Sequence, residues 1–324
     1  MDTGTLLAGL AGLVLLGLGG EVLVRGAVGI ARWLGVSPLF TGLVIVGFGT
    51  SMPELAASLD AALQGSPGIA LGNVLGSNIA NILLILGLTA AILPIPAEPA
   101  AFRRDAPMLA LATLACAAVV LSGSMGRSTG VVFLLMLVSY LVYTFRTESR
   151  VQDESAQLHA LGGTLLRPSP SQAGISLALA GGGLAAILVG ADLLVTASLA
   201  VARALQIPDT VIGLTIVAVG TSLPELATSL AAAFKRETDI ALGNIIGSNI
   251  FNILGILGAT ALVTPLAVPV QVARFDVWVL LGVTALLLVF AFSRARITRG
   301  EGVIFLLLYA GYIAFLVART MGRL

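Results

Sequence analysis

Charge is scarce in this 324-residue chain: only 10% of the residues are Asp, Glu, Lys or Arg, against about 25% in a typical soluble domain. Hydrophobic residues make up 58%, so the expected solvent is lipid rather than water. The formal net charge of +1 leaves no basic excess, and a nucleic acid is therefore not an expected partner. The single cysteine, Cys116, cannot form an internal disulfide, and its apolar surroundings predict a packing role.

Other chemical groups are also missing. The only histidine, His159, lies in a polar stretch and is predicted at the surface. No His or Lys accompanies a serine in the apolar segments, and the paired aspartates of a membrane protease are absent, so an enzyme is not expected. The N-terminal apolar run has no basic stretch before it and is predicted to be a retained helix rather than a signal peptide.

Apolar segments of about 20 residues, long enough to cross a bilayer, follow one another along the chain. Ten spans are predicted, five in each half, at residues 4–31, 40–63, 68–93, 106–122, 128–145, 173–203, 211–234, 239–263, 276–292 and 302–319. A polar segment at residues 147–172 is predicted to be a solvated linker between the halves 1–146 and 173–324. The expected fold is an all-α membrane protein with ten transmembrane helices.

The distribution of Lys and Arg predicts how the chain is oriented. The loops after the odd-numbered spans hold 11 of these residues, and the opposite face holds 5. Because cytoplasmic loops carry the excess, the linker is predicted in the cytoplasm and both termini outside the cell membrane. Five spans per half invert the second half relative to the first, as in secondary transporters whose substrate site lies at the midplane between two repeats.

The two halves share a repeated motif. Residues 41–89 align without gaps on residues 212–260, with 31 identities in 49 positions. The first copy contains GFGTSMPE followed by ALGNVLGSNI, and the second contains AVGTSLPE followed by ALGNIIGSNI. Weaker matches at the same offset pair Glu21 with Asp192, Arg103 with Arg274, and Asp105 with Asp276.

Each copy places one glutamate, Glu54 or Glu225, midway along an apolar segment. An ionisable residue at that depth costs roughly 2.5–3.5 kcal/mol, which indicates a function. Polar residues at helical spacing share a face with these glutamates or form a stripe on the next span: Thr50, Ser51, Ser58, Asn73, Ser77 and Asn81, then Thr221, Ser222, Ser229, Asn244, Ser248 and Asn252. Oxygen ligands without His or Cys favour hard cations such as Ca²⁺, Na⁺ or Mg²⁺.

Proline and glycine predict local backbone features of the repeats. Pro53 and Pro224 lack the N–H that a helix needs, so carbonyls near residues 47–50 and 218–221 are predicted to line a cavity or bind an ion. Two small-xxx-small pairs are predicted to let helices pack closely: Gly72 with Gly76, and Gly243 with Gly247. Glu21 and Arg25 are predicted to form an interfacial ion pair, although a gating role for Glu21 and Asp192 stays open.

These motifs resemble those of the cation/Ca²⁺ exchanger superfamily, and most closely those of prokaryotic Na⁺/Ca²⁺ exchangers. The resemblance implies four short core helices, the second, third, seventh and eighth spans, across which the long first and sixth spans slide. It implies a central Ca²⁺ site at Glu54 and Glu225 with Thr50 and Thr221. Flanking Na⁺ sites are implied at Ser51, Ser77 and the Gly47 carbonyl, and at Ser222, Ser248 and the Ala218 carbonyl, with Asn81 and Asn252 between them.

The asparagine pair is where the chain departs from the family pattern. Many Na⁺/Ca²⁺ exchangers carry an aspartate at one of the positions of Asn81 and Asn252. Two formal charges balance one Ca²⁺ or two monovalent cations, whereas a third Na⁺ would leave excess charge in a low-dielectric site. This argues against three-to-one coupling and against K⁺ co-transport, and leaves room for coupling to protons.

The function expected is exchange of Na⁺ for Ca²⁺ across the cell membrane by alternating access. An H⁺/Ca²⁺ exchanger, or one for another divalent cation, is the alternative. A passive channel is disfavoured because it has no need of two mirrored motifs. No cofactor is expected beyond the transported cations, and the partners are the lipid bilayer and metal cations. A monomer is expected to suffice, with an oligomer left open.

Overall fold

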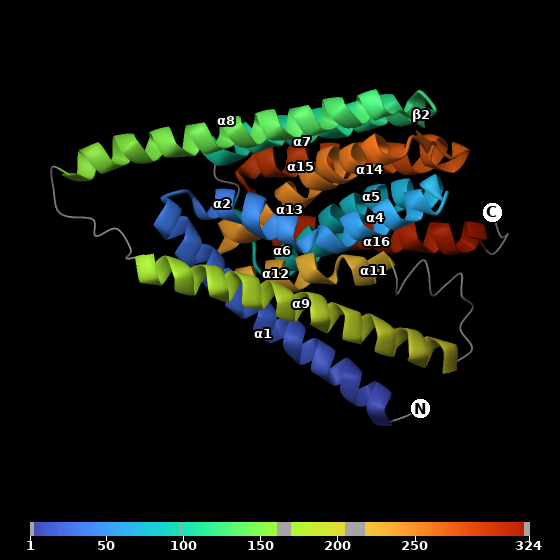
Figure 1. The fold of residues 1–324 in the computed structure, drawn as a ribbon, viewed down its shortest axis with the longest axis horizontal. Coiled ribbons are helices and arrows are strands. Elements are labelled where there is room, and N and C mark those ends of the chain that lie inside the picture. Colours follow the sequence, from blue (N-terminus) through green and yellow to red (C-terminus); the bar gives the residue numbers. More distant parts are fainter. Residues whose placement is uncertain (1–2, 97–98, 161–169, 205–217, 321–324) are drawn as a thin grey trace.

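The computed structural model describes residues 3–96, 99–160, 170–204 and 218–320, and every long element among them is a helix (Figure 1). In chain order the helical elements are α1 (Thr3–Leu34), α2 (Pro38–Thr41), η1 (Gly42–Val46), α3 (Gly47–Thr50), α4 (Met52–Leu63), α5 (Pro67–Ala80), η2 (Asn81–Leu86), α6 (Gly87–Ile92), α7 (Pro99–Leu121), α8 (Arg127–Ala160), α9 (Pro170–Ala204), α11 (Ala218–Thr221), α12 (Leu223–Phe234), α13 (Thr238–Ile250), η4 (Phe251–Leu257), α14 (Gly258–Val263), η5 (Val272–Asp276), α15 (Val277–Arg294) and α16 (Arg299–Thr320). Elements named η are π-helical. The short strands are β1 (Ile95–Pro96), β2 (Ser124–Met125), β3 (Leu266–Ala267) and β4 (Arg296–Ile297).

The described helices agree with the predicted membrane spans. Eight helices are long and apolar enough to cross a bilayer, and the bent pair Pro38–Thr50 and Met52–Leu63 makes a ninth. The remaining predicted span, residues 211–234, is described only from Ala218 onward, where α11 and α12 follow each other. An all-helical protein is the expected outcome in lipid, because a helix satisfies its own backbone hydrogen bonds.

The two repeated motifs form the core of the molecule. In the span Thr238–Val263, 89% of the most apolar window is buried, whereas the corresponding share in Arg299–Arg319 is 17%. Figure 1 shows α1 and α9 together on one side of this core and α7 and α8 on the other. The outer helices therefore shield the broken core helices from lipid. Cys116 of α7 is fully buried against the core, as expected.

The two long helices α1 and α9 pack through glycines that the sequence analysis did not single out. A Cβ on Gly12 would lie 2.7 Å from the carbonyl oxygen of Gly190, and one on Gly19 would lie 2.9 Å from that of Gly183. Gly26, a further seven residues along, leaves equally little room beside α9. Because these positions carry no side chains, the two backbones touch where the helices cross.

Two short antiparallel strand pairs connect loops of the first half with loops of the second. β1, after the third span, pairs with β4, after the ninth, while β2, after the fourth, pairs with β3, after the eighth. Each pair therefore joins two loops that the sequence analysis places on one face of the membrane. In Figure 1, α1 begins and α16 ends near the end of the molecule that carries β2.

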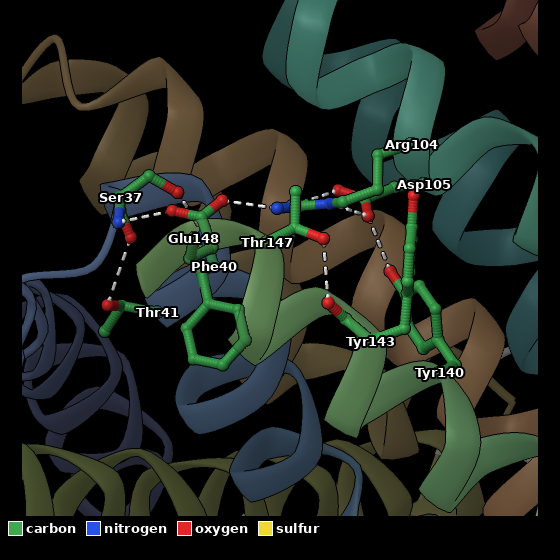
Figure 2. A network of polar contacts seen from close by, with 9 residues as sticks. All are labelled: Ser37, Phe40, Thr41, Arg104, Asp105, Tyr140, Tyr143, Thr147 and Glu148. Atoms are coloured by element: carbon green, nitrogen blue, oxygen red, sulfur yellow. Dashed lines mark hydrogen bonds and ion pairs between the residues drawn. The ribbon is translucent and has the colours of Figure 1, made fainter. Parts of the chain in front are cut away.

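The helix α8 continues past the predicted end of its span, so the first part of the predicted linker is helical up to Ala160. Glu148, which falls in that linker, is not solvated: its side chain is 12% exposed. It accepts hydrogen bonds from the guanidinium of Arg104 and, at 2.9 Å, from the backbone N–H of Ser37 (Figure 2). The prediction of a solvated segment is wrong for this residue because the fold brings an arginine of α7 to it. The rest of the predicted linker, residues 161–169, and the side chain of His159 lie outside the described residues.

Candidate cation site

Each repeat breaks its helix immediately before the buried glutamate. In the first half α3 ends at Thr50, Ser51 has φ −86° and ψ 9°, and α4 begins with an axis turned by 42°. In the second half Ser222 has nearly the same conformation, φ −91° and ψ 6°, between α11 and α12. Pro53 and the equivalent Pro224 occupy the first turn of the new helix. Backbone N–H groups in a first turn have no partner within the helix, so proline costs no hydrogen bond there. The predicted interruption is present in both halves.

The two carboxylates lie at the start of the new helices and are almost completely buried. Glu54 and Glu225 are each 1% exposed and stand in the first turn of α4 and of α12. A helix N-terminus carries partial positive charge, which favours a carboxylate there. The hydroxyl of Ser51 donates to Oε1 of Glu225 at 2.8 Å, so residues from opposite halves meet in one place. Neither carboxylate forms an ion pair with any described residue.

Several buried polar atoms of the two repeats have no hydrogen-bond partner among the described residues. They include both oxygens of Glu54, Oε2 of Glu225, the hydroxyl of Ser222, and the side-chain amide atoms of Asn78, Asn81 and Asn252. An unsatisfied buried polar group costs roughly 1–3 kcal/mol, and an uncompensated buried charge costs more. A desolvated cation held by these oxygens would offset that cost.

One asparagine holds each glutamate helix in place. Nδ2 of Asn73 donates to the backbone carbonyl of Glu54 at 3.2 Å and to the hydroxyl of Ser58 at 2.9 Å. Asn244 makes the same two bonds, with the same lengths, to Glu225 and Ser229. The polar stripes predicted from the sequence therefore face each other in pairs, and their asparagines position the backbone of the glutamates. The helical period predicts these stripes but does not reveal that their asparagines position the glutamate backbone.

The hydroxyls and carbonyls of the first repeat lie close to residues of the second. The hydroxyl of Ser248 donates to the carbonyl of Gly47 at 3.1 Å, and Oγ1 of Thr50 donates to the same carbonyl at 3.3 Å. The single hydroxyl proton of Thr50 has two further acceptors within reach, the carbonyl oxygen of Val46 at 3.0 Å and Oδ1 of Asn244 at 3.3 Å. These contacts bring the Gly47 carbonyl, Thr50 and Ser248 together.

Two of the equivalent residues line a cavity. Ser77 is 4% exposed and Thr221 is half-buried, and both border a cavity of about 480 Å³ that also reaches Asn73. Ala218 opens the short helix α11, but its side chain lies outside the described ones. The candidate residues therefore lie at the two breaks, on the helices that meet there, and on the next span of each repeat, α5 with η2 and α13 with η4.

The two asparagines that depart from the family pattern, Asn81 and Asn252, lie where an α-helix becomes π-helical. Asn81 begins the π-helical segment η2, and Asn252 is the second residue of its counterpart η4. A π-helical turn widens the backbone and is common at functional sites. Both side chains are buried, at 1% and 0% exposed. Asn78 and Asn249 are a further pair of equivalent asparagines in the two repeats. Asn249 donates to the carbonyl of Ile245 at 2.7 Å and so bonds within its own helix.

The predicted glycine pairs behave differently in the two halves. A Cβ on Gly243 would lie 2.3 Å from the carbonyl oxygen of Leu39, and one on Gly247 would lie 2.1 Å from that of Leu43. This pair does let two helices touch. Gly72 and Gly76 instead border the 480 Å³ cavity, and no described atom lies within 4 Å of a Cβ placed there. The prediction of close packing is therefore not supported by the described residues for the first pair.

The outlying acidic residues are Glu21 of α1 and Asp192 of α9. Glu21 pairs with Arg25, as predicted, and also with Nζ of Lys235 at 3.2 Å. Asp192 borders a second cavity, of about 420 Å³, which lies between α9 and the two helix breaks and also touches Thr221. The sequence offered no sign of the ion pair to Lys235, because the two residues are separated by 214 positions.

The chain matches the profile of the sodium/calcium exchanger protein family over residues 4–146 and 175–318. It is 36% identical to the inner membrane protein YrbG of Escherichia coli K12, over 95% of this chain and 94% of that protein. It is 35% identical to the sodium/calcium exchanger MaX1 of Methanosarcina acetivorans, over 95% and 97% respectively. A solved structure of the sodium-calcium exchanger NCX_Mj matches with a TM-score of 0.83 at 36% identity, covering 97% of this chain and 99% of that one.

Each of the two matched segments contains one copy of the repeat with its broken helix and buried glutamate. The matches cover nearly the whole chain and agree with the apolar, multi-pass helical structure. The family consists of secondary transporters, not enzymes, and several relatives are named sodium/calcium exchangers or antiporters. The chain belongs to the sodium/calcium exchanger family of membrane proteins.

Proposed function

We propose that this protein exchanges Na⁺ for Ca²⁺ by alternating access and uses the inward Na⁺ gradient to remove Ca²⁺ from the cell. One observation carries the proposal: Glu54 and Glu225 are buried in opposite halves, and polar atoms without a described hydrogen-bond partner recur along both repeats. Structures of the relative NCX_Mj from crystals soaked with Na⁺, Ca²⁺ or Sr²⁺ support these ions as substrates.

The chemistry of the candidate ligands favours a hard cation. Carboxylate, hydroxyl, amide and backbone oxygens surround the glutamates, and such ligands suit Ca²⁺ and Na⁺ rather than softer metals. In this proposal Ca²⁺ bridges Glu54 and Glu225, with Thr50 and Thr221 beside them. Asn81 and Asn252 complete the middle of the site.

Na⁺ would occupy positions on either side of the carboxylates. One set comprises Ser51, Ser77 and the Gly47 carbonyl, and the other comprises Ser222, Ser248 and the Ala218 carbonyl. The bond from Ser51 to Glu225 and the bond from Ser248 to Gly47 support this arrangement, because they bring donors of one half to acceptors of the other.

The energetic cost of leaving both buried carboxylates without a cation explains why the protein would exchange ions rather than leak them. Two buried carboxylates without a cation pay several kcal/mol each in lost hydration, and they repel each other. The ion-free site should therefore resist passing through the state closed to both sides, whereas a loaded site passes. Two formal charges balance one Ca²⁺ or two Na⁺, so we propose exchange that moves no net charge.

The same site would also accept protons. Protonation neutralises both carboxylates as two Na⁺ would, and the two asparagines keep the charge low enough for this. An H⁺/Ca²⁺ exchanger on the same scaffold is therefore the second candidate. The two candidate functions differ in the ion that drives Ca²⁺ transport, Na⁺ in one and H⁺ in the other.

We infer ten spans in two inverted halves, 1–146 and 173–324, joined by a cytoplasmic linker at residues 147–172. The pairing of β1 with β4 and of β2 with β3 supports the assignment of loops to two faces. Both termini would then lie outside the cell membrane. Because both carboxylates come from one chain, a monomer would suffice for transport.

The test uses purified protein in proteoliposomes loaded with Na⁺. Dilution into Na⁺-free medium with Ca²⁺ should give Ca²⁺ uptake in the wild type, and a pH gradient alone should not. E54Q and E225Q should each abolish uptake, whereas D60N should not, because Asp60 is an exposed acid on the same helix as Glu54. Normal uptake by both glutamine variants would refute the site, and uptake driven only by the pH gradient would establish the second candidate.

A further inference from the structure

An aspartate–tyrosine pair occurs once in each half, outside the repeated motifs. The hydroxyl of Tyr140 donates to Oδ1 of Asp105 at 2.8 Å, and the hydroxyl of Tyr312 donates to Oδ1 of Asp276 at 3.3 Å. The two aspartates stand 171 positions apart, the same offset as the two buried glutamates. Each tyrosine comes from the last long helix of its half, α8 or α16. The two pairs are therefore counterparts.

In the first half an arginine neutralises the aspartate. Arg104 donates to both carboxylate oxygens of Asp105, at 2.7 and 2.8 Å, and also pairs with Glu148 (Figure 2). Asp105 is completely buried. This bidentate pair is a strong one, and it leaves the carboxylate with no capacity for a further cation. The pair in the first half is structural.

In the second half no arginine replaces it. The position equivalent to Arg104 is Phe275, whose ring stacks on Phe315 with centroids 4.4 Å apart. Asp276 forms no ion pair with any residue that the structure describes, and Arg319 of α16 acts on it only through space. The carboxylate of Asp276 therefore lacks the bidentate arginine partner that its counterpart has.

Asp276 also differs in its surroundings, because it borders the 480 Å³ cavity that reaches Ser77 and Thr221. It is the only charged residue among the described residues that line this cavity. The remaining lining includes further oxygen donors and acceptors, such as Tyr312, Asn73 and Gln271. One carboxylate in a cavity that also reaches the candidate ligands Ser77 and Thr221 is placed to attract cations.

We propose that Asp276, with the hydroxyl of Tyr312, forms a recruiting subsite for a hydrated cation in the cavity that reaches the candidate ligands Ser77 and Thr221. The inference rests on the proposed function and adds an outer step to it. A cavity of about 480 Å³ holds several waters, at about 30 Å³ each. The cation would therefore keep most of its hydration shell there and lose it only at the two glutamates.

An electrostatic subsite has a signature that depends on the valence of the ion. A fixed negative charge raises the local concentration of a monovalent cation by a Boltzmann factor, and that of a divalent cation by the square of this factor. A unit charge about 10 Å from the cation gives a factor of about three at an effective dielectric constant of about 50, suited to a partly wet cavity. The charge of Asp276 should then improve the apparent affinity about three-fold for Na⁺ and about nine-fold for Ca²⁺. A purely structural role predicts no such relation.

The side of the membrane provides a second signature. The residues lining the cavity, including Ile69, Gln271 and Leu316, lie toward the end of the molecule that carries β2 and β3. The effect should therefore appear only for cations added on that face, which is predicted to be the outer one. Right-side-out and inverted membrane vesicles measure the two faces separately.

The experiment compares D276N, D276E and the wild type in both kinds of vesicle. D276N should weaken the apparent affinity for outer Ca²⁺ about nine-fold and for outer Na⁺ about three-fold, with unchanged values at the inner face. D276E should behave nearly as the wild type. D60N serves as the matched control, because Asp60 is an exposed acid near the same face and outside the cavity.

Charge rescue at one position keeps the test independent of folding. The native Cys116 is fully buried, so D276C offers the one accessible thiol among the described residues. Reaction with an anionic methanethiosulfonate should restore the affinity for outer Ca²⁺, and reaction with a cationic one should weaken it further. Equal effects of both reagents, or D276N with unchanged affinity in a wild type that exchanges Ca²⁺, would overturn the proposal. A wild type without Ca²⁺ exchange would instead overturn the proposed function.

Discussion

Neutralising Glu54 should make the ion-free protein more stable and the Ca²⁺-loaded protein less so. The two carboxylate oxygens of Glu54 are buried and have no hydrogen-bond partner among the described residues. Glutamine has the same shape but no charge, so E54Q removes both the desolvation cost and the repulsion from Glu225. Opposite effects in the two conditions are the mark of a residue kept for binding rather than for folding.

The magnitude follows from the charges involved. Two unit charges about 4 Å apart contribute roughly 4 kcal/mol at an effective dielectric constant of about 20, and a divalent cation doubles this. Desolvation offsets several kcal/mol of the gain. A net loss of about 3–5 kcal/mol for Ca²⁺ corresponds to an affinity lowered by roughly a hundred- to several thousand-fold. The loss for Na⁺ should be smaller, because its charge is half as large.

Thermal unfolding in detergent measures both effects at once. At a Ca²⁺ concentration 100 times the dissociation constant, the wild type should gain about 2.7 kcal/mol, a shift of a few degrees in midpoint temperature. E54Q should start from a higher midpoint in a Ca²⁺ chelator and show no shift with Ca²⁺. A wild-type shift retained in E54Q would refute the assignment of this carboxylate, and a lower ion-free midpoint would refute the reasoning on its cost.

The remaining predictions concern protons, coupling and packing. Protons compete with cations for the two buried carboxylates, so Ca²⁺ affinity should fall as the pH is lowered. The gain in ion-free stability of E54Q should shrink over the same range. A Ca²⁺-binding titration between pH 8.5 and 5.5 measures the affinity, and a pH-independent value would contradict the prediction. N252D adds a third carboxylate to the buried site, so more Na⁺ should be exchanged per Ca²⁺, and uptake that ignores a K⁺/valinomycin potential in the wild type should become potential-dependent. G247A should lower the midpoint temperature by several degrees, because its Cβ would lie 2.1 Å from the carbonyl oxygen of Leu43, whereas G282A on the exposed face of α15 should not; equal effects of the two would contradict this close approach.

Most of the fold can be predicted from the sequence because a bilayer permits few solutions. Apolar segments of spanning length must become helices, and nine of the ten predicted spans appear as such in the described residues. The helix break before Glu54 is equally local, since Pro53 cannot donate the hydrogen bond that a continuous helix needs. Buried polar stripes follow from the helical period, and these predictions need no knowledge of tertiary contacts.

The candidate site was predicted by residue type and by resemblance, but its organisation was not. The sequence placed Asn73 and Ser58 on polar stripes, yet only the structure shows the asparagine bonding the hydroxyl at 2.9 Å. The bond from Ser51 to Glu225 joins positions 174 residues apart. Periodicity describes one helix at a time, so it cannot assign partners across two helices.

What the sequence determined by itself is therefore the set of helices, their breaks and the oxygen-rich motif, because each depends on neighbours along the chain. What the tertiary structure decided is the difference between two halves that look alike in sequence. The glycine pair of the second repeat packs against a helix while that of the first borders a cavity, and Asp105 is neutralised while Asp276 is not. Such differences depend on contacts between distant segments, and a repeat in the sequence does not reveal where its two copies are treated differently.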